Sequence, residues 1–174
     1  MRWVLYIGVG LVGLGLVVVL AGAMLPRAHT TSRVIHIDRA PEEVWEVITD
    51  FSNNPSWRED IKAVERMPNR DGREVWREVS TGGDVIPYET VLAEPPRRLV
   101  RRIADPSLPF SGSWTIDVSP RGTGSAVRIT EQGEVPNPVF RFVSRVLIGH
   151  SSYIDKYLTS LARRFNQDAE PTDA

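Results

Sequence analysis

The stretch between residues 59 and 139 places the strongest constraint on the fold of this chain, because it contains no helical period. Short runs of alternating apolar and polar residues follow one another there, separated by clusters of Gly, Pro, Asn and Asp that are typical of turns. Connections as short as these favour antiparallel neighbours. The pattern predicts a meander of six strands, over residues 61–67, 73–80, 85–94, 98–104, 112–119 and 125–135.

The segments on either side of this meander predict one further strand and two helices. Residues 33–38 alternate as a strand, and Pro41, followed by Glu42 and Glu43, is typical of the first turn of a helix. Apolar residues recur every three or four positions between 139 and 165, which predicts a long amphipathic helix. We therefore expect an α+β fold in which a seven-stranded antiparallel sheet wraps around a long C-terminal helix, with a cavity between them.

The N-terminus is strongly apolar, with no charged residue between Trp3 and Leu25. A helix rises about 1.5 Å per residue, so this run is long enough for the roughly 30 Å hydrocarbon core of a bilayer. We expect one transmembrane helix here and a single-pass membrane protein, with the folded domain on the extracytoplasmic side. A cleaved signal peptide is the alternative, because Ala21-Gly22-Ala23 resembles a cleavage site.

These features divide the chain into three predicted parts. Residues 1–31 form the transmembrane anchor and a linker, residues 32–166 form the folded domain, and residues 167–174 form a disordered polar tail.

The composition excludes several classes of function. The chain has no cysteine, so it has no disulfide, thiolate metal site or cysteine nucleophile. The net charge is −1, and residues 1–31 carry Arg2 and Arg27 but no acid, so the folded part is acidic overall and unsuited to nucleic acid. The three histidines lack the spacing of a metal site, and no P-loop, GxSxG or HExxH motif occurs. We therefore expect no metal, no cofactor and no nucleic-acid partner.

The start of the predicted domain carries a characteristic order of residues. Ala40-Pro41 begins the predicted helix, Asp50-Phe51 ends it, and Trp57 follows a short turn. Together with the strand before them, these residues resemble the SRPBCC or START-like helix-grip superfamily, and within it the polyketide cyclase/dehydrase and lipid-transport branch. The resemblance extends over residues 33–165 and implies a helix-grip fold around a cavity for an apolar ligand.

The resemblance and the predicted anchor together indicate a membrane-tethered protein that binds, or transports, a hydrophobic small molecule or lipid in its internal cavity. Its partners would be that ligand and the bilayer, which the segment from Trp3 to Leu25 enters. The alternative is a polyketide cyclase or dehydratase-like enzyme, a lyase or isomerase, in which a cavity side chain acts as acid and base.

His150 is the candidate acid–base residue, because it falls on the apolar stripe of the helix expected beside the cavity. Aromatic side chains with a polar end are suited to line such a cavity, and Arg101 shares a strand face with Leu99 and Ile103. For each of these residues, a place in the packed core is the alternative. The candidate cavity residues are Trp57, Trp76, Tyr88, Arg101, Trp114, His150, Ile154 and Tyr157.

Overall fold

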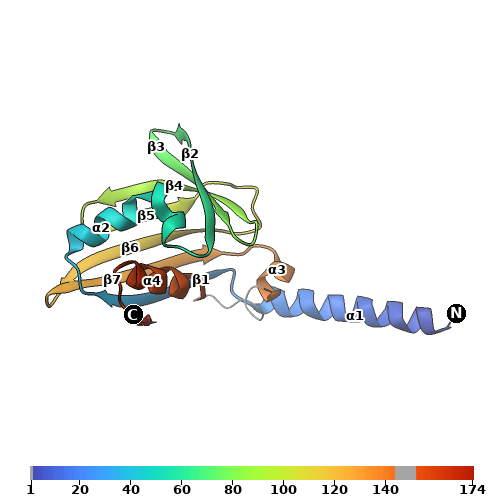
Figure 1. Ribbon diagram of the computed structural model, residues 1–174. Helices are drawn as coiled ribbons and strands as arrows, with labels where there is room; N and C mark the ends of the chain where they lie inside the picture. The colour runs from blue at the N-terminus through green and yellow to red at the C-terminus, as the bar shows by residue number, and fades with distance from the viewer. Residues whose placement is uncertain (1, 144–151) are drawn as a thin grey trace.

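An antiparallel sheet forms the body of the protein (Figure 1). The computed structural model describes residues 2–143 and 152–174, without the side chains at positions 2, 4, 5, 8, 9, 11 and 12. Within these residues the sheet has eight strands in the order β2-β3-β4-β5-β6-β7-β1-β8. The strands are β1 (Ala28–Ile37), β2 (Ile61–Arg70), β3 (Arg73–Ser80), β4 (Val85–Glu94), β5 (Arg98–Ile103), β6 (Ser111–Arg121), β7 (Gly124–Glu134) and β8 (Thr172–Asp173).

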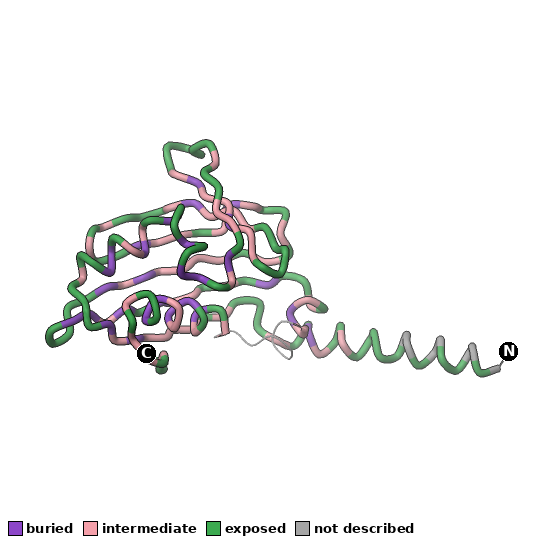
Figure 2. Tube along the Cα trace, in the orientation of Figure 1, coloured by how far each residue is buried: buried purple, intermediate pink, exposed green. Residues whose placement is uncertain are grey.

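Helices cover part of the sheet and extend beyond it. The helices α2 (Pro41–Thr49) and α4 (Ser152–Arg164) contribute their buried side chains, with those of β1, β5, β6 and β7, to one hydrophobic core. The 3-10 helix η1 (Phe51–Ser56) follows α2 and contacts β2. The helices α1 (Arg2–Met24) and α3 (Pro138–Val143) contact each other beyond one end of the sheet, and α1 extends away from it with mostly exposed residues (Figures 1 and 2).

The start of α2 lies where the sequence predicts it, at Pro41. Proline suits the first helical position because the N–H that it lacks would have no partner within the helix there. Ala40 N–H donates a hydrogen bond of 3.1 Å to the Glu43 carboxylate, which satisfies another amide at this end. α2 ends at Thr49, and η1 with the turn after it places Asn54 and Arg58 at buried positions.

The sheet has eight strands rather than the seven predicted. β1 begins at Ala28, inside the segment expected as a linker, and β8 pairs with it. The guanidinium of Arg33 explains this pairing, because it donates to Asp155 on α4 at 2.6 Å and also to the carboxylate of Asp173 on β8. A strand of two residues is too short to show the alternation from which strands are predicted.

The long helix predicted over residues 139–165 is also corrected. The structure describes two shorter helices in this range, α3 and α4. Residues 144–151, with the predicted acid–base residue His150, lie outside the described residues. α3 contacts α1, whereas α4 contacts β1, so the two described helices pack against different parts of the protein. A periodic apolar stripe indicates which positions are buried, but it does not require one continuous helix to bury them.

The transmembrane prediction is corrected as well. A helical span requires about 20 consecutive, predominantly apolar residues. In the part of the chain that the structure describes, no helix combines the length and the apolar character that crossing a membrane requires. The predicted span from Trp3 to Leu25 and the predicted single-pass membrane location are therefore wrong.

A buried arginine joins α1 to the rest of the protein. The Arg141 guanidinium, on α3, donates to Gly22 O at 3.0 Å, to Leu25 O at 2.8 Å and to Val135 O at 2.9 Å. The last carbonyls of a helix have no partner within the helix, so a cationic donor at this place stabilises the end of α1. Arg141 thus attaches α1 by donating hydrogen bonds both to the backbone at the end of α1 and to the backbone just after β7.

The buried face of α4 allows a test of the core. We expect Leu161→Ala, at a position with 0% exposure, to lower the free energy of unfolding by about 2–5 kcal/mol, because it leaves a cavity among packed side chains. Arg164→Ala, at an exposed position of the same helix, should change it by less than about 0.5 kcal/mol. Urea unfolding followed by circular dichroism measures both, and equal losses would contradict the packing of α4 described above.

Candidate functional site

Two adjoining spaces lie between the sheet and the helices. The larger, here called the main cavity, has a volume of about 450 Å³ and a mainly apolar lining from β1 to β7, α3 and α4. The smaller, here called the inner pocket, has a volume of about 40 Å³ and reaches α2, η1 and the core side of α4. The volume of the main cavity falls within the range of roughly 300–1,000 Å³ that is usual for small-molecule sites. Both spaces are lined by Arg58, Glu78, Tyr88 and Trp114.

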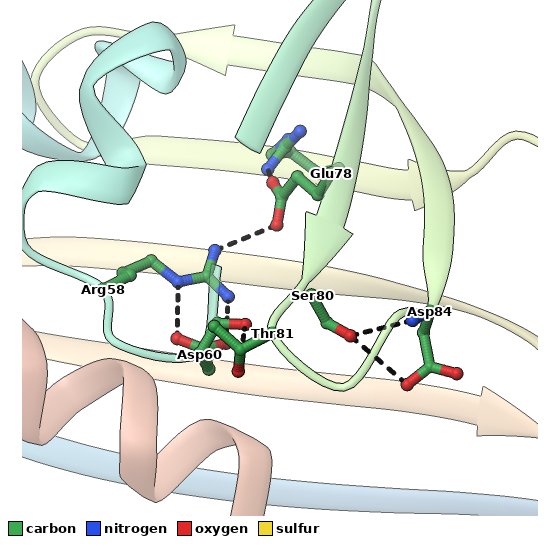
Figure 3. A network of polar contacts seen from close by, with 7 residues as sticks. Arg58, Asp60, Glu78, Ser80, Thr81 and Asp84 are labelled. Atoms are coloured by element: carbon green, nitrogen blue, oxygen red, sulfur yellow. Dashed lines mark hydrogen bonds and ion pairs between the residues drawn. The ribbon is translucent and has the colours of Figure 1, made fainter. Parts of the chain in front are cut away.

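Four charged residues form a network where the two spaces meet, and Figure 3 shows Arg58 between Asp60 and Glu78. Arg58 holds Asp60 through two bonds, from Nη2 at 2.7 Å and from Nε at 3.3 Å, and Glu78 through Nη1 at 3.0 Å. Glu78 accepts a second bond, of 2.5 Å, from Arg101 Nη1. The network therefore joins the turn after η1, strand β3 and strand β5.

Charge pairing keeps this network ionised. Burial alone would raise the pKa of Glu78, but the charges of Arg101 and Arg58 outweigh burial and hold its pKa below the ordinary value. Burial alone would lower the pKa of Arg58, but Glu78 and Asp60 raise it above the ordinary value. Glu78 thus remains a carboxylate and Arg58 a guanidinium cation at neutral pH.

Aromatic rings cover the faces of both guanidinium groups. The Arg101 guanidinium lies 4.2 Å from the ring centre of Phe51 and 4.9 Å from that of Tyr88, and the Arg58 guanidinium lies 5.0 Å from that of Tyr157. Such contacts stabilise a cation through the face of the ring, so its N–H groups stay available for hydrogen bonds. Burial raises the pKa of Tyr88 above its ordinary value and that of Tyr157 to about 12, so both hydroxyls remain protonated.

A second polar group lies in the wall of the main cavity. Glu131 on β7 accepts a bond of 2.7 Å from Trp114 Nε1, and His29 Nε2 on β1 lies 2.9 Å from its other oxygen. Gly133 makes room for this imidazole, because a Cβ at that position would lie 2.3 Å from the His29 ring. A histidine beside a carboxylate is a common arrangement for proton transfer. Among the described residues, no cluster of three His, Asp or Glu side chains is arranged to hold a metal ion.

The candidate residues named from the sequence fall into three groups. Tyr88 and Trp114 line both spaces, and Arg101 and Tyr157 line the inner pocket. Three others, Trp57, Trp76 and Ile154, pack in or against the core and are absent from both linings. The ring centre of Trp57 lies 5.3 Å from that of Tyr157, and the ring centre of Trp76 lies 5.9 Å from that of Phe51. Ile154 is fully buried. His150 lies outside the described residues. Whether those that line the spaces contact a ligand stays a prediction.

Sequence reasoning missed the residues that organise the site. Arg58 and Asp60 lie in a turn, where no periodicity shows the direction of a side chain. Glu78 shares one face of β3 with Trp76, a signal that would have placed it with the cavity candidates. His29 was assigned to a linker, and its partner Glu131 is far from it in the sequence, so only the pairing of β1 with β7 brings them together.

The chain belongs to a known family. A family model described as polyketide cyclase/dehydrase and lipid transport matches residues 28–166, which is most of the chain. This agrees with the resemblance noted over residues 33–165. No curated protein matches the chain.

Solved structures share the fold at low sequence identity. A crystal structure of a protein from Thermus thermophilus has a TM-score of 0.63 and 20% identity, over 79% of this chain and 97% of that chain. A norcoclaurine synthase point mutant from Thalictrum flavum, bound to a transition-state analogue, has a TM-score of 0.63 and 10% identity, over 80% and 94%. The di-domain ARO/CYC protein BexL has a TM-score of 0.63 and 13% identity, over 86% and 53%. At these identities the likeness concerns the fold alone.

The buried network predicts a large loss of stability when its shared anion is removed. Glu78→Gln leaves the buried charges of Arg58 and Arg101 short of a counter-ion, so we expect the free energy of unfolding to fall by about 3–5 kcal/mol. Asp117→Asn, which removes a half-buried partner of the more exposed Arg98, should have a much smaller effect. Thermal unfolding at pH 7 compares the two, and a Glu78→Gln protein as stable as the Asp117→Asn protein would contradict this account of the network.

Proposed function

We propose that this protein binds a hydrophobic small molecule or lipid in the main cavity. The observation that carries the proposal is the cavity itself, a partly open and mainly apolar space of about 450 Å³ between the sheet and the helices. Transferring apolar surface from water into such a space is favourable, at roughly 25 cal/mol per Å² buried. The family description, which includes lipid transport, supports the same class of ligand.

The charges in the cavity wall are compatible with an apolar occupant. The charge of Arg58 is compensated by Asp60 and Glu78. Both oxygens of Glu131 are bonded within the wall, to Trp114 and His29, so neither group requires a ligand as its hydrogen-bond partner. A buried charge that lacks a partner would instead have favoured a ligand of opposite charge or water. The wall therefore offers its apolar surface to a ligand at little electrostatic cost.

Ligand occupancy can be measured directly. We expect native mass spectrometry of the full-length chain, purified from its own host, to show a stoichiometric adduct that organic extraction releases as an apolar compound. A clean mass for the protein alone, with no uptake from a panel of added lipids and polyketides, would contradict the proposal.

A cavity-filling variant gives the matched comparison. Ile86 on β4 lines the main cavity and shares a strand face with Tyr88, so Ile86→Trp should occupy part of the cavity volume and weaken uptake of an apolar dye about tenfold or more. Val85→Trp, at an exposed position of the same strand that lines neither space, should leave uptake unchanged. Fluorescence titration of the full-length chain measures both, and equal uptake by the two variants would place the dye elsewhere.

A second candidate function rests on the pair of His29 and Glu131. In a dehydratase-like reaction the imidazole would remove the proton next to a ketone of a β-hydroxy ketone, and the hydroxyl would then leave as water with that proton. The products are an enone and water, so no oxidant or reductant is required. Glu131 would hold the imidazole and stabilise its cationic form.

The enzymatic alternative predicts that activity depends on His29. We expect His29→Gln to slow conversion of a β-hydroxy ketone to its enone by about 100-fold or more, followed by the absorbance of the enone. His36→Gln, which changes a more exposed histidine on the same strand, should retain the rate of the unmodified protein. Unchanged turnover in His29→Gln, with ligand binding intact, would remove His29 from the reaction and leave binding as the function.

A further inference from the structure

One edge of the Arg101 guanidinium has no partner. Its Nη1 donates to Glu78 at 2.5 Å, but Nε and Nη2 are buried and form no hydrogen bond with any residue that the structure describes. Buried N–H groups are nearly always paired, because leaving one without a partner forfeits the bond it made with water. Arg101 is one of the residues that line the inner pocket, so an internal space adjoins this side chain.

The same edge of a neighbouring arginine shows what such a pair of donors binds. Arg58 uses its Nε and Nη2 together to hold the two oxygens of Asp60. These two N–H groups point in parallel, which suits a planar group with one or two sp2 oxygens. In Arg101 the equivalent pair of donors has no partner among residues 2–143 and 152–174.

Arg101 is held in place, so this edge cannot easily turn to another partner. Phe51 and Tyr88 lie on its guanidinium, and its backbone on β5 pairs with Thr90 on β4 and with Trp114 on β6. A donor pair held in one orientation binds with less loss of side-chain entropy than a mobile arginine would. The protein thus presents a preorganised site for an acceptor.

The inner pocket contains a second polar atom without a partner. Asn54 is 2% exposed, lines the pocket, and its Oδ1 accepts no hydrogen bond from the described residues. The pocket volume of about 40 Å³ suits a few atoms, such as the end of a ligand or ordered water, and is too small for a whole ligand. The main cavity adjoins the pocket and has the space for a larger apolar body.

We propose that the inner pocket is a subsite for the oxygen-bearing end of the ligand, and that Arg101 Nε and Nη2 bind its carbonyl or carboxylate oxygen. The inference rests on the proposed binding function, since the rest of the ligand lies in the main cavity. It defines the ligand class as an apolar molecule that ends in a ketone or a carboxyl group, and a hydroxyl beside that group would donate to Asn54.

Three probes of equal chain length test the subsite: decanoic acid, decan-2-one and decane. Their affinities for the full-length chain are measured by displacement of a fluorescent apolar dye. We expect the acid or the ketone to bind at least about tenfold more tightly than decane, and Arg101→Met to weaken that probe by about 10- to 100-fold while leaving decane unchanged. The preferred probe shows whether a carboxylate or a neutral carbonyl is recognised.

Two further variants separate recognition from folding. Arg101→Lys keeps the positive charge opposite Glu78 but lacks the parallel donors, so it should fold as the unmodified protein does and still lose most of the preference. Arg102→Met changes the next residue on β5, which pairs with Glu89 and lines neither space, and should bind all three probes normally.

The outcomes distinguish the subsite from the proposed function. A preference for the acid or ketone that is lost in Arg101→Lys and kept in Arg102→Met supports the subsite. Equal binding of all three probes by the unmodified protein overturns the subsite, with water as the occupant of the inner pocket, and leaves the binding function in place. If no probe binds, the proposed function fails and the subsite fails with it. Parallel loss of decane binding in Arg101→Lys would show that Arg101 only shapes the cavity, and would also overturn the subsite.

Discussion

The pairing of Glu78 with two arginines is the interaction on which the internal space of this protein depends. Arg58 comes from the turn after η1 and Arg101 from β5, so the single carboxylate on β3 joins a helical segment to two strands. Burying these charges is costly, and apolar residues of similar volume could give equal or greater stability. The network is therefore better understood as a determinant of position, because the charges are satisfied in one arrangement of the turn relative to the sheet.

The same network determines how the internal space is divided. Arg58 and Glu78 line both the main cavity and the inner pocket, so the two spaces meet where the charges neutralise one another. On the cavity side the walls are mainly apolar and their charged groups have partners, such as Glu131 with Trp114, whereas the pocket keeps polar atoms of Arg101 and Asn54 without described partners. An apolar molecule with one polar end fits this division, since its two parts have opposite requirements for solvation.

Much of the sheet could be predicted because its information is local. Alternation and turn residues predicted β2 to β7, and Pro41 with two acidic residues predicted the start of α2. The errors arose where a local pattern was extended too far. An apolar N-terminal run was interpreted as a membrane span, an apolar stripe over residues 139–165 was interpreted as one long helix, and a tail with no pattern was left without its strand β8.

The candidate site was predicted only in part, because local sequence patterns and tertiary contacts carry different information. The sequence by itself determined the class of fold, because alternation, helical spacing and turn residues are local signals. Among its aromatic candidates for the cavity, Tyr88 and Trp114 line both spaces, whereas Trp57 and Trp76 line neither. Only the tertiary structure decided which polar groups meet. Glu78 binds Arg58 and Arg101 from different elements, and His29 meets Glu131 through the register of β1 on β7. Alternation indicates which face of a strand a side chain occupies, but the partner across the sheet depends on register and on the folding of distant segments into one core.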